Sequence, residues 1–175
     1  MLVNNFKRLL AISMKNDMGF KSKNFSNATK NIPMPPGSSM DYAKNNLKYV
    51  SGTYNNTNVA LGLVIGSGGT TPKLTDYKLE NEITTGFTEN TGSVTFGNGK
   101  TLLSMTITAG STITINEVGV RLVVAAVNAS STRDDCSILL TRSVLPEPIM
   151  LQSNQTKVFV VEIDYNSFID NVNNL

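Results

Sequence analysis

The sequence predicts a mainly β protein: an antiparallel β-sandwich or jelly roll with a short N-terminal helix and an extended arm. Asn, Ser and Thr make up about a third of the 175 residues, and these side chains favour turns and pleated strands over helices. From residue 48 onward, short apolar or alternating runs recur between Gly, Asn and Pro. Roughly eight such runs, about 8–15 residues apart, are typical of two packed antiparallel sheets.

The chain divides into three regions. Residues 1–47 form an N-terminal helix and an extended basic arm, residues 48–165 form the β-sandwich domain, and residues 166–175 form a polar C-terminal tail. The length suits one full domain, and the 40% hydrophobic content supports a core.

The N-terminal helix is expected over residues 2–14. Leu2, Phe6, Leu9 and Leu10 fall on one face at helical spacing. A helix this short is not stable alone in water. We therefore expect these four side chains to bind a partner: the body of the same chain, a second copy, or another protein.

Residues 15–47 are expected to be irregular, because Pro33, Pro35, Pro36 and Gly37 follow in quick succession. Residues 1–50 hold eight basic and two acidic residues, a balance of +6, whereas residues 51–175 carry −4. The basic residues are scattered, and the nearby aromatic residues lack the spacing of a base-stacking platform. We expect them to keep the arm soluble, and nucleic-acid binding to be unlikely.

The first half of the body holds three expected strands: 48–54, 59–65, and a less regular one around 82–87. The second is a buried apolar run that ends at a Gly-rich stretch, residues 66–71. That stretch lacks the Gly-Lys-Ser/Thr of a phosphate loop, so we interpret it as a wide loop between strands.

The second half alternates more regularly. Residues 94–96 lead to a turn at 97–99, and Leu103, Met105 and Ile107 share one face of the next strand. Apolar segments follow at residues 113–115 and 118–127, and residues 129–135 form a polar loop.

The last two expected strands cover residues 136–144 and 158–165. Pro146 and Pro148 are expected to end the first of them. Apolar residues occupy both faces of the second, which predicts a strand in the middle of a sheet.

The composition argues against an enzyme, a cofactor and a metal site. The chain has no His and a single Cys, which removes the commonest general base and any thiolate zinc site. Cys136, beside Asp134 and Asp135, is expected to be a small buried residue. Glu117 lies among apolar strand residues, so it should sit at a bulge or pair with Arg121 or Arg142.

Other features argue against small-molecule and membrane partners. Glu80, Glu82, Glu89 and Glu147 are interpreted as solvated surface residues. The chain has no run of 18 apolar residues, so no transmembrane helix is expected. Its first twelve residues lack the unbroken apolar stretch of a signal peptide.

Six short segments of the sequence, taken in order, are similar to those of a known group of proteins. They are Asn4–Leu10, Gly66–Pro72, Asp76–Leu79, Thr114–Gly119, Leu139–Leu145 and Thr156–Val161. Together they resemble small virion structural proteins of tailed bacteriophages, which attach to the capsid or the tail. The resemblance covers about residues 60–165, with a weaker similarity at 1–12. Residues 13–50 form a long basic segment that has no counterpart.

The resemblance implies a non-enzymatic component of the virion, associated with its tail, neck, baseplate or capsid. Such a protein would assemble as a symmetric oligomer through its β-sandwich and N-terminal arm. Its partners would be copies of itself and other virion proteins. An alternative is a carbohydrate- or receptor-binding β-sandwich module, although the chain has no Trp to stack on a sugar ring.

Overall fold

The structure, a computed structural model, describes residues 19–23, 29–33, 48–49, 60–98, 100–127 and 133–164. This part of the chain contains nine β-strands. They are β1 (Gly19–Lys23), β2 (Thr29–Pro33), β3 (Lys48–Tyr49), β4 (Ala60–Gly66), β5 (Phe87–Gly97), β6 (Lys100–Ala109), β7 (Ile113–Val127), β8 (Arg133–Leu151) and β9 (Thr156–Asp164).

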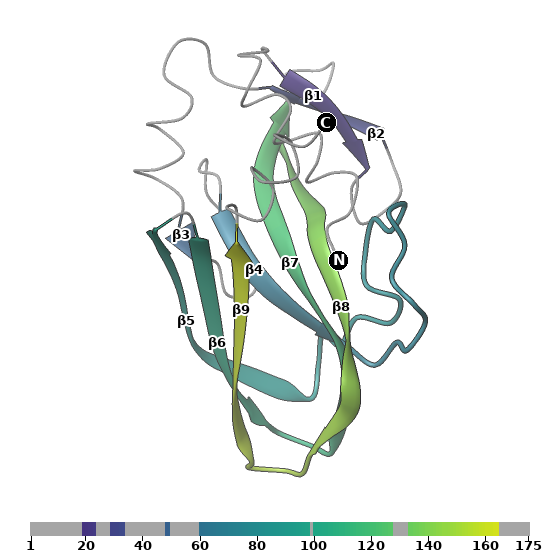
Figure 1. The fold of residues 1–175 in the computed structure, drawn as a ribbon, viewed down its shortest axis with the longest axis vertical. Coiled ribbons are helices and arrows are strands. Elements are labelled where there is room, and N and C mark those ends of the chain that lie inside the picture. Colours follow the sequence, from purple (N-terminus) through teal and green to yellow (C-terminus); the bar gives the residue numbers. More distant parts are fainter. Residues whose placement is uncertain are drawn as a thin grey trace.

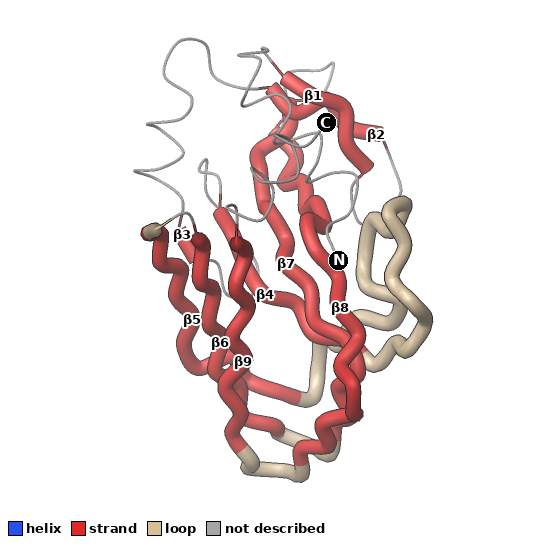
Figure 2. The backbone as a smooth tube through the Cα atoms, in the orientation of Figure 1, coloured by secondary structure: helices blue, strands red, loops and turns tan. Residues whose placement is uncertain are grey.

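Two antiparallel sheets pack face to face (Figures 1 and 2). The first sheet has the order β4-β7-β8, and the short β3 pairs parallel to β4 at its edge. The second sheet has the order β5-β6-β9. The prediction of a mainly β sandwich is confirmed. Outside the two sheets, β1 and β2 form an antiparallel pair.

Hairpins and crossovers alternate along the sandwich. β5 and β6 form one hairpin and β7 and β8 form another, each within its own sheet. The chain crosses between sheets from β4 to β5, from β6 to β7 and from β8 to β9. Asn98 has a φ of 51° in the turn after β5, which is the turn expected at residues 97–99. Asn tolerates this left-handed conformation better than most residues.

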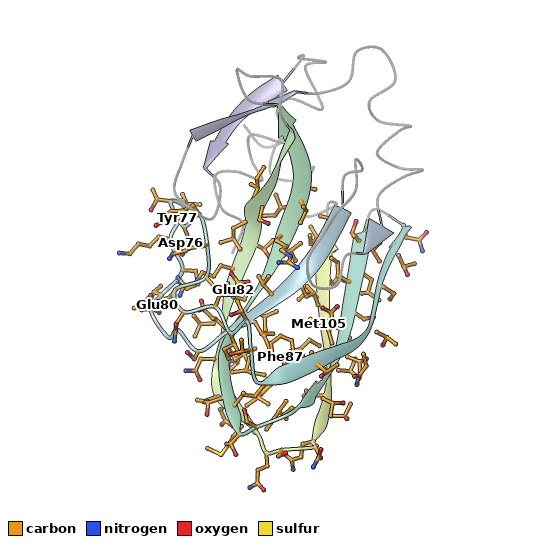
Figure 3. The ribbon with its side chains drawn as sticks, turned by 180° about the vertical axis from the view of Figure 1, so that it is seen from behind. Asp76, Tyr77, Glu80, Glu82, Phe87 and Met105 are labelled. Carbon is orange, nitrogen blue, oxygen red and sulfur yellow. The ribbon has the colours of Figure 1, made fainter. Side chains whose placement is uncertain are left out.

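The core lies between the sheets and follows the alternation of the sequence. Leu103, Met105 and Ile107 of β6 are fully buried, whereas Leu102 on the opposite face is 41% exposed. Figure 3 shows Met105 pointing into the space between the sheets. Inward-facing residues of β4, β7, β8 and β9 complete the same cluster. The predicted face of β6 is therefore confirmed.

β8 differs from the prediction, because the strand continues through both prolines to Leu151. Its register against β7 shifts: Val144 pairs with Glu117, and Ile149 pairs with Ile115. The segment between them lies opposite Asn116 alone. A bulge of this kind leaves residues unpaired, so the prolines, which cannot donate to the ladder, do not interrupt it.

Two other strand predictions are wrong. β9 is the edge strand of its sheet and not a central one. Its outward side chains Val158 and Val160 are 54% and 58% exposed, so an apolar residue on each face did not mean burial on each face. The strand expected around residues 82–87 is absent: residues 82–86 form a loop with an isolated bridge between Gly66 and Glu82, and β5 begins at Phe87.

Several expectations concern residues outside the described part of the chain. These are the helix at 2–14, most of the strand at 48–54, most of the polar loop at 129–135, and the tail at 166–175. The described end of that loop, residues 133–135, is wrongly predicted, because it belongs to β8. Residues 15–47 were expected to be irregular, which is wrong for β1 and β2: these two strands of that segment pair with each other. The strand expected at 59–65 is confirmed as β4.

Adjacent leucines of β6 test the packing. We expect Leu103→Ala to lower the free energy of unfolding by about 2–5 kcal/mol, because it leaves a cavity between the sheets. Leu102→Ala should change it by only about 0.5 kcal/mol, because that side chain faces solvent. Urea unfolding followed by circular dichroism measures both. Equal losses would contradict the assigned faces of β6.

Candidate functional site

The predicted partner-binding residues Leu2, Phe6, Leu9 and Leu10 lie outside the described part of the chain. The structure therefore neither brings them together nor separates them. Within the described part, charged side chains gather at the loop of residues 67–86, which connects β4 to β5. This loop lies beside β8 (Figures 1 and 2), and Figure 3 shows Asp76, Tyr77 and Glu80 along it.

Glu117 of β7 is the centre of this cluster. The register between β7 and β8 shifts between Ile115 and Glu117. Without the shift, alternation would place both side chains on the core face; with it, Ile115 packs in the core and Glu117 turns to the outer face. The carboxylate is nevertheless fully buried, because the loop folds over it.

Four donors satisfy the Glu117 carboxylate. Oε1 accepts hydrogen bonds from the backbone N–H groups of Gly68, at 3.2 Å, and Asn81, at 2.9 Å. Oε2 accepts one from the N–H of Glu80 at 3.2 Å and one from Nε of Arg142 at 2.6 Å. A carboxylate has about four acceptor positions, so all of them are occupied: three by the loop and one by Arg142.

Arg142 of β8 is the counter-charge, as the sequence analysis allowed. Its side chain is 2% exposed, and it pairs across the ladder with Gly119. Nη1 donates to Oδ2 of Asp76 at 2.8 Å, and Nη2 lies 3.3 Å from Oε2 of Glu80. Burial alone would lower the pKa of the guanidinium, but the hydrogen bonds to Asp76 and Glu117 outweigh it and raise the pKa.

Glu80 is not the plain solvated residue that the sequence analysis expected. Its Oε2 accepts hydrogen bonds from the N–H and the hydroxyl of Thr70, at 2.8 and 2.9 Å. These bonds, the backbone one first, lower the pKa of the Glu80 carboxyl. On the other side of the loop, Asp76 accepts from the N–H of Lys73 at 2.9 Å. The two carboxylates thus fix the loop internally and bind it to Arg142.

The loop approaches the sheet closely because glycines leave room for it. A Cβ at Gly68 would lie 2.4 Å from Cβ of Glu80, and one at Gly119 would lie 2.9 Å from a methyl group of Leu79. Leu79 is fully buried and packs against Val64 and Leu139 in a small second apolar cluster. The loop therefore has its own small core on the outer face of the first sheet.

The sequence signals for this site were partial. Glu117 was expected at a bulge or in an ion pair, and it is in both. The Gly-rich stretch was correctly interpreted as a loop, but its role in closing over a carboxylate was missed. One signal was available: an acidic residue in an apolar strand requires donors, and a Gly-rich loop exposes backbone N–H groups.

The other acidic residues and the cysteine that the sequence singled out form no second site among the described residues. Asp134, Asp135 and Cys136 belong to β8, but their side chains lie outside the described part. Glu82 and Glu89 are half-buried, and Glu147 is exposed as expected. Among the described residues, no three or more His, Cys, Asp or Glu side chains are grouped so that they could hold a metal ion. Likewise, no described helix is long and apolar enough to cross a membrane.

We expect Arg142→Met to lower the free energy of unfolding by about 3–5 kcal/mol, because it leaves Glu117 charged and buried. The loop should also become accessible to proteases. The control is Lys100→Met, which breaks an ion pair with Glu162 of 2.8 Å whose side chains are 42% and 45% exposed and should change stability little. Chemical unfolding and limited proteolysis measure both variants. Similar behaviour of the two would refute the buried pair.

Glu82 predicts a dependence on pH. Burial raises the pKa of its carboxyl above the ordinary 4.5, and repulsion from Glu117 adds to this, whereas Arg121 and Lys78 oppose it. The folded protein holds this proton more tightly than the unfolded chain, so stability at this position falls as pH rises through the raised pKa. Glu82→Gln should therefore raise the free energy of unfolding at pH 7.

The gain from Glu82→Gln should vanish below pH 4.5, where the carboxyl is protonated in both states. Exposed Glu147→Gln is the matched control and should give no gain at either pH. Urea unfolding at the two pH values measures the effect. A gain of equal size at both would mean that charge is not its cause.

Comparisons with protein-family models, with curated proteins and with solved structures find no match for this chain.

Proposed function

We propose that the protein is a non-enzymatic structural component of a tailed-bacteriophage virion, which assembles as a symmetric oligomer through its β-sandwich and its N-terminal arm. The observation that carries the proposal is the position of β9 at the edge of its sheet in the described part of the chain, where Val158 and Val160 are more than half exposed. Exposed apolar residues on an edge strand mark a surface that another chain covers. The resemblance of residues 60–165 to small virion proteins supports the same function.

The arm supplies the second contact. Residues 2–14 form a helix in this proposal, at the start of the basic segment 1–50 with its balance of +6. Within the arm, β1 and β2 pair with each other, and β2 contacts β7 of the body. Leu2, Phe6, Leu9 and Leu10 bind a neighbouring subunit or another virion protein. The position in the particle is the tail, neck, baseplate or capsid. The proposal includes no small-molecule substrate, no cofactor, no nucleic acid and no membrane.

A receptor- or carbohydrate-binding module is the second candidate. The loop of residues 67–86 favours it, since Arg142 and Glu117 hold the loop rigidly while Leu74 at its turn is 43% exposed. Binding residues are often found on loops that a rigid scaffold positions. A monomer that attaches to host cells, and loses attachment when residues 71–75 are replaced by Gly and Ser, would favour this candidate over the first.

The arm is tested with Leu9→Asp and Leu10→Asp in the full chain. Each fully buried apolar side chain contributes roughly 1.5–3 kcal/mol before ordering costs. A surface ion pair contributes about 0–1 kcal/mol. The leucine variants should therefore reduce oligomer formation and incorporation into particles more than the controls Lys15→Ala and Lys21→Ala.

Circular dichroism first confirms that each variant folds, and sedimentation and particle incorporation are then measured. Normal assembly of the leucine variants, with failure of the lysine variants and steep loss in salt, would make the arm an electrostatic tether and refute the packing account.

A further inference from the structure

Four strands bound the two sheets of the sandwich in the described part of the chain: β3, β8, β5 and β9. Three of them carry features that hinder pairing with another chain. β3 is two residues long, β8 is bulged around Pro146 and Pro148, and the register of β5 shifts between Glu89 and Thr91. β9 runs for nine residues with no proline and no shift against β6.

The side chains of β9 divide into a core face and an outer face. Phe159 and Ile163 are buried between the sheets, and Val158 and Val160 are exposed on the other side. The charged residues Lys157, Glu162 and Asp164 lie toward the ends of the strand. Glu162 and Asp164 already pair with Lys100 of β6, at 2.8 and 3.6 Å. The middle of this edge therefore carries no charge.

The hydrogen-bond phase of β9 shows which backbone groups face outward. The N–H of Ala109 donates to the carbonyl of Gln155 at 2.9 Å, so Gln155 directs its carbonyl toward β6. Residues of an antiparallel strand alternate between bonding to one neighbour and to the other. Val158, Val160 and Glu162 therefore direct their N–H and C=O groups away from β6.

We propose that β9 pairs antiparallel with β9 of a second copy across a two-fold axis at Phe159. Val158 of each copy then lies opposite Val160 of the other, and Thr156 lies opposite Glu162. These outward-facing residues form the hydrogen-bonded pairs of the new ladder, and the two β5-β6-β9 sheets join into one.

The charge pattern selects this register. If the two-fold axis moves to Val160, Val158 lies opposite Glu162. If it moves to Val158, Thr156 lies opposite Val160, and the ladder between the two strands becomes shorter. With the axis at Phe159, apolar β-branched residues face each other and no like charges do, which is the favourable arrangement for cross-strand pairs. The pairing gives the symmetric oligomer a defined contact and so rests on the proposed function.

The experiment uses the full chain with Val158→Lys and Val160→Lys combined. Lysines then face each other twice across the two-fold axis, so we expect the dissociation constant of the dimer to rise at least about tenfold. Analytical ultracentrifugation over a range of concentrations measures it. The control is Leu102→Lys, which places a lysine on the same outer face but on the central strand, and should leave the dimer intact.

Crosslinking tests the register in a Cys136→Ser background. Opposite residues of a hydrogen-bonded pair have Cα atoms about 5.5 Å apart, which is within the range for a disulfide. A mixture of Val158→Cys and Val160→Cys proteins should form a crosslinked dimer on mild oxidation, and either variant alone should form much less. Equal crosslinking of Val158→Cys alone would overturn this register.

The outcomes separate the two proposals. An oligomer that persists in the lysine variant would overturn the β9 contact but leave a symmetric oligomer. Loss of attachment to another virion protein, with the homodimer unchanged, would mean that the partner's strand occupies the edge, and would overturn pairing between copies. A full-length protein that is monomeric at every concentration and attaches to no virion protein would overturn both.

Discussion

The ion pair between Glu117 and Arg142 is the constraint on which the outer layer of the first sheet depends. Removing two charges from water costs several kcal/mol for each unless their hydrogen bonds are complete. Here the Glu117 carboxylate is completed by three backbone N–H groups of the loop and by the guanidinium. The loop supplies three of the four donors to this carboxylate, so burial of the pair depends on the closed position of the loop.

Two irregularities in the β7-β8 ladder make this possible. The shift after Ile115 brings Glu117 to the outer face, and a second shift between Val120 and Arg121 allows Gly119 to pair with Arg142. Bulges redirect side chains in this way without ending a sheet. Pro146 and Pro148 lie in the bulge of β8 at the first shift. The same bulge therefore brings the Glu117 carboxylate to the outer face and accommodates two prolines that a regular ladder would exclude.

The sequence predicted strands most accurately where one face of the strand is buried and the other is exposed to solvent. Leu103, Met105 and Ile107 followed that rule, and β6 was predicted with its correct face. Periodicity could not assign β9, because an edge strand with exposed valines and a central strand have the same apolar pattern. It also could not extend β8 through its prolines, since a bulge depends on the partner strand and not on local sequence.

The candidate site shows the same division. The polarity of Glu117 in an apolar strand predicted a partner, and Arg142 was one of two named candidates. Asp76, Glu80 and Thr70 could not be assigned, because they come from a loop whose path is set by contacts 36–72 residues apart in sequence. Local composition gives such residues the appearance of an ordinary solvated loop.

The loop also decides which surfaces remain for other chains. Leu79 and the loop occupy the outer face of the first sheet over Val64 and Leu139. A second molecule cannot stack on that area while the Glu117–Arg142 pair is closed. The second sheet has no such cover among the described residues: Leu102, Val158 and Val160 stay exposed. Among the described residues, the outer face of the first sheet is therefore covered over Val64 and Leu139, whereas the β5-β6-β9 sheet exposes apolar side chains; Met150 of β8 is exposed as well.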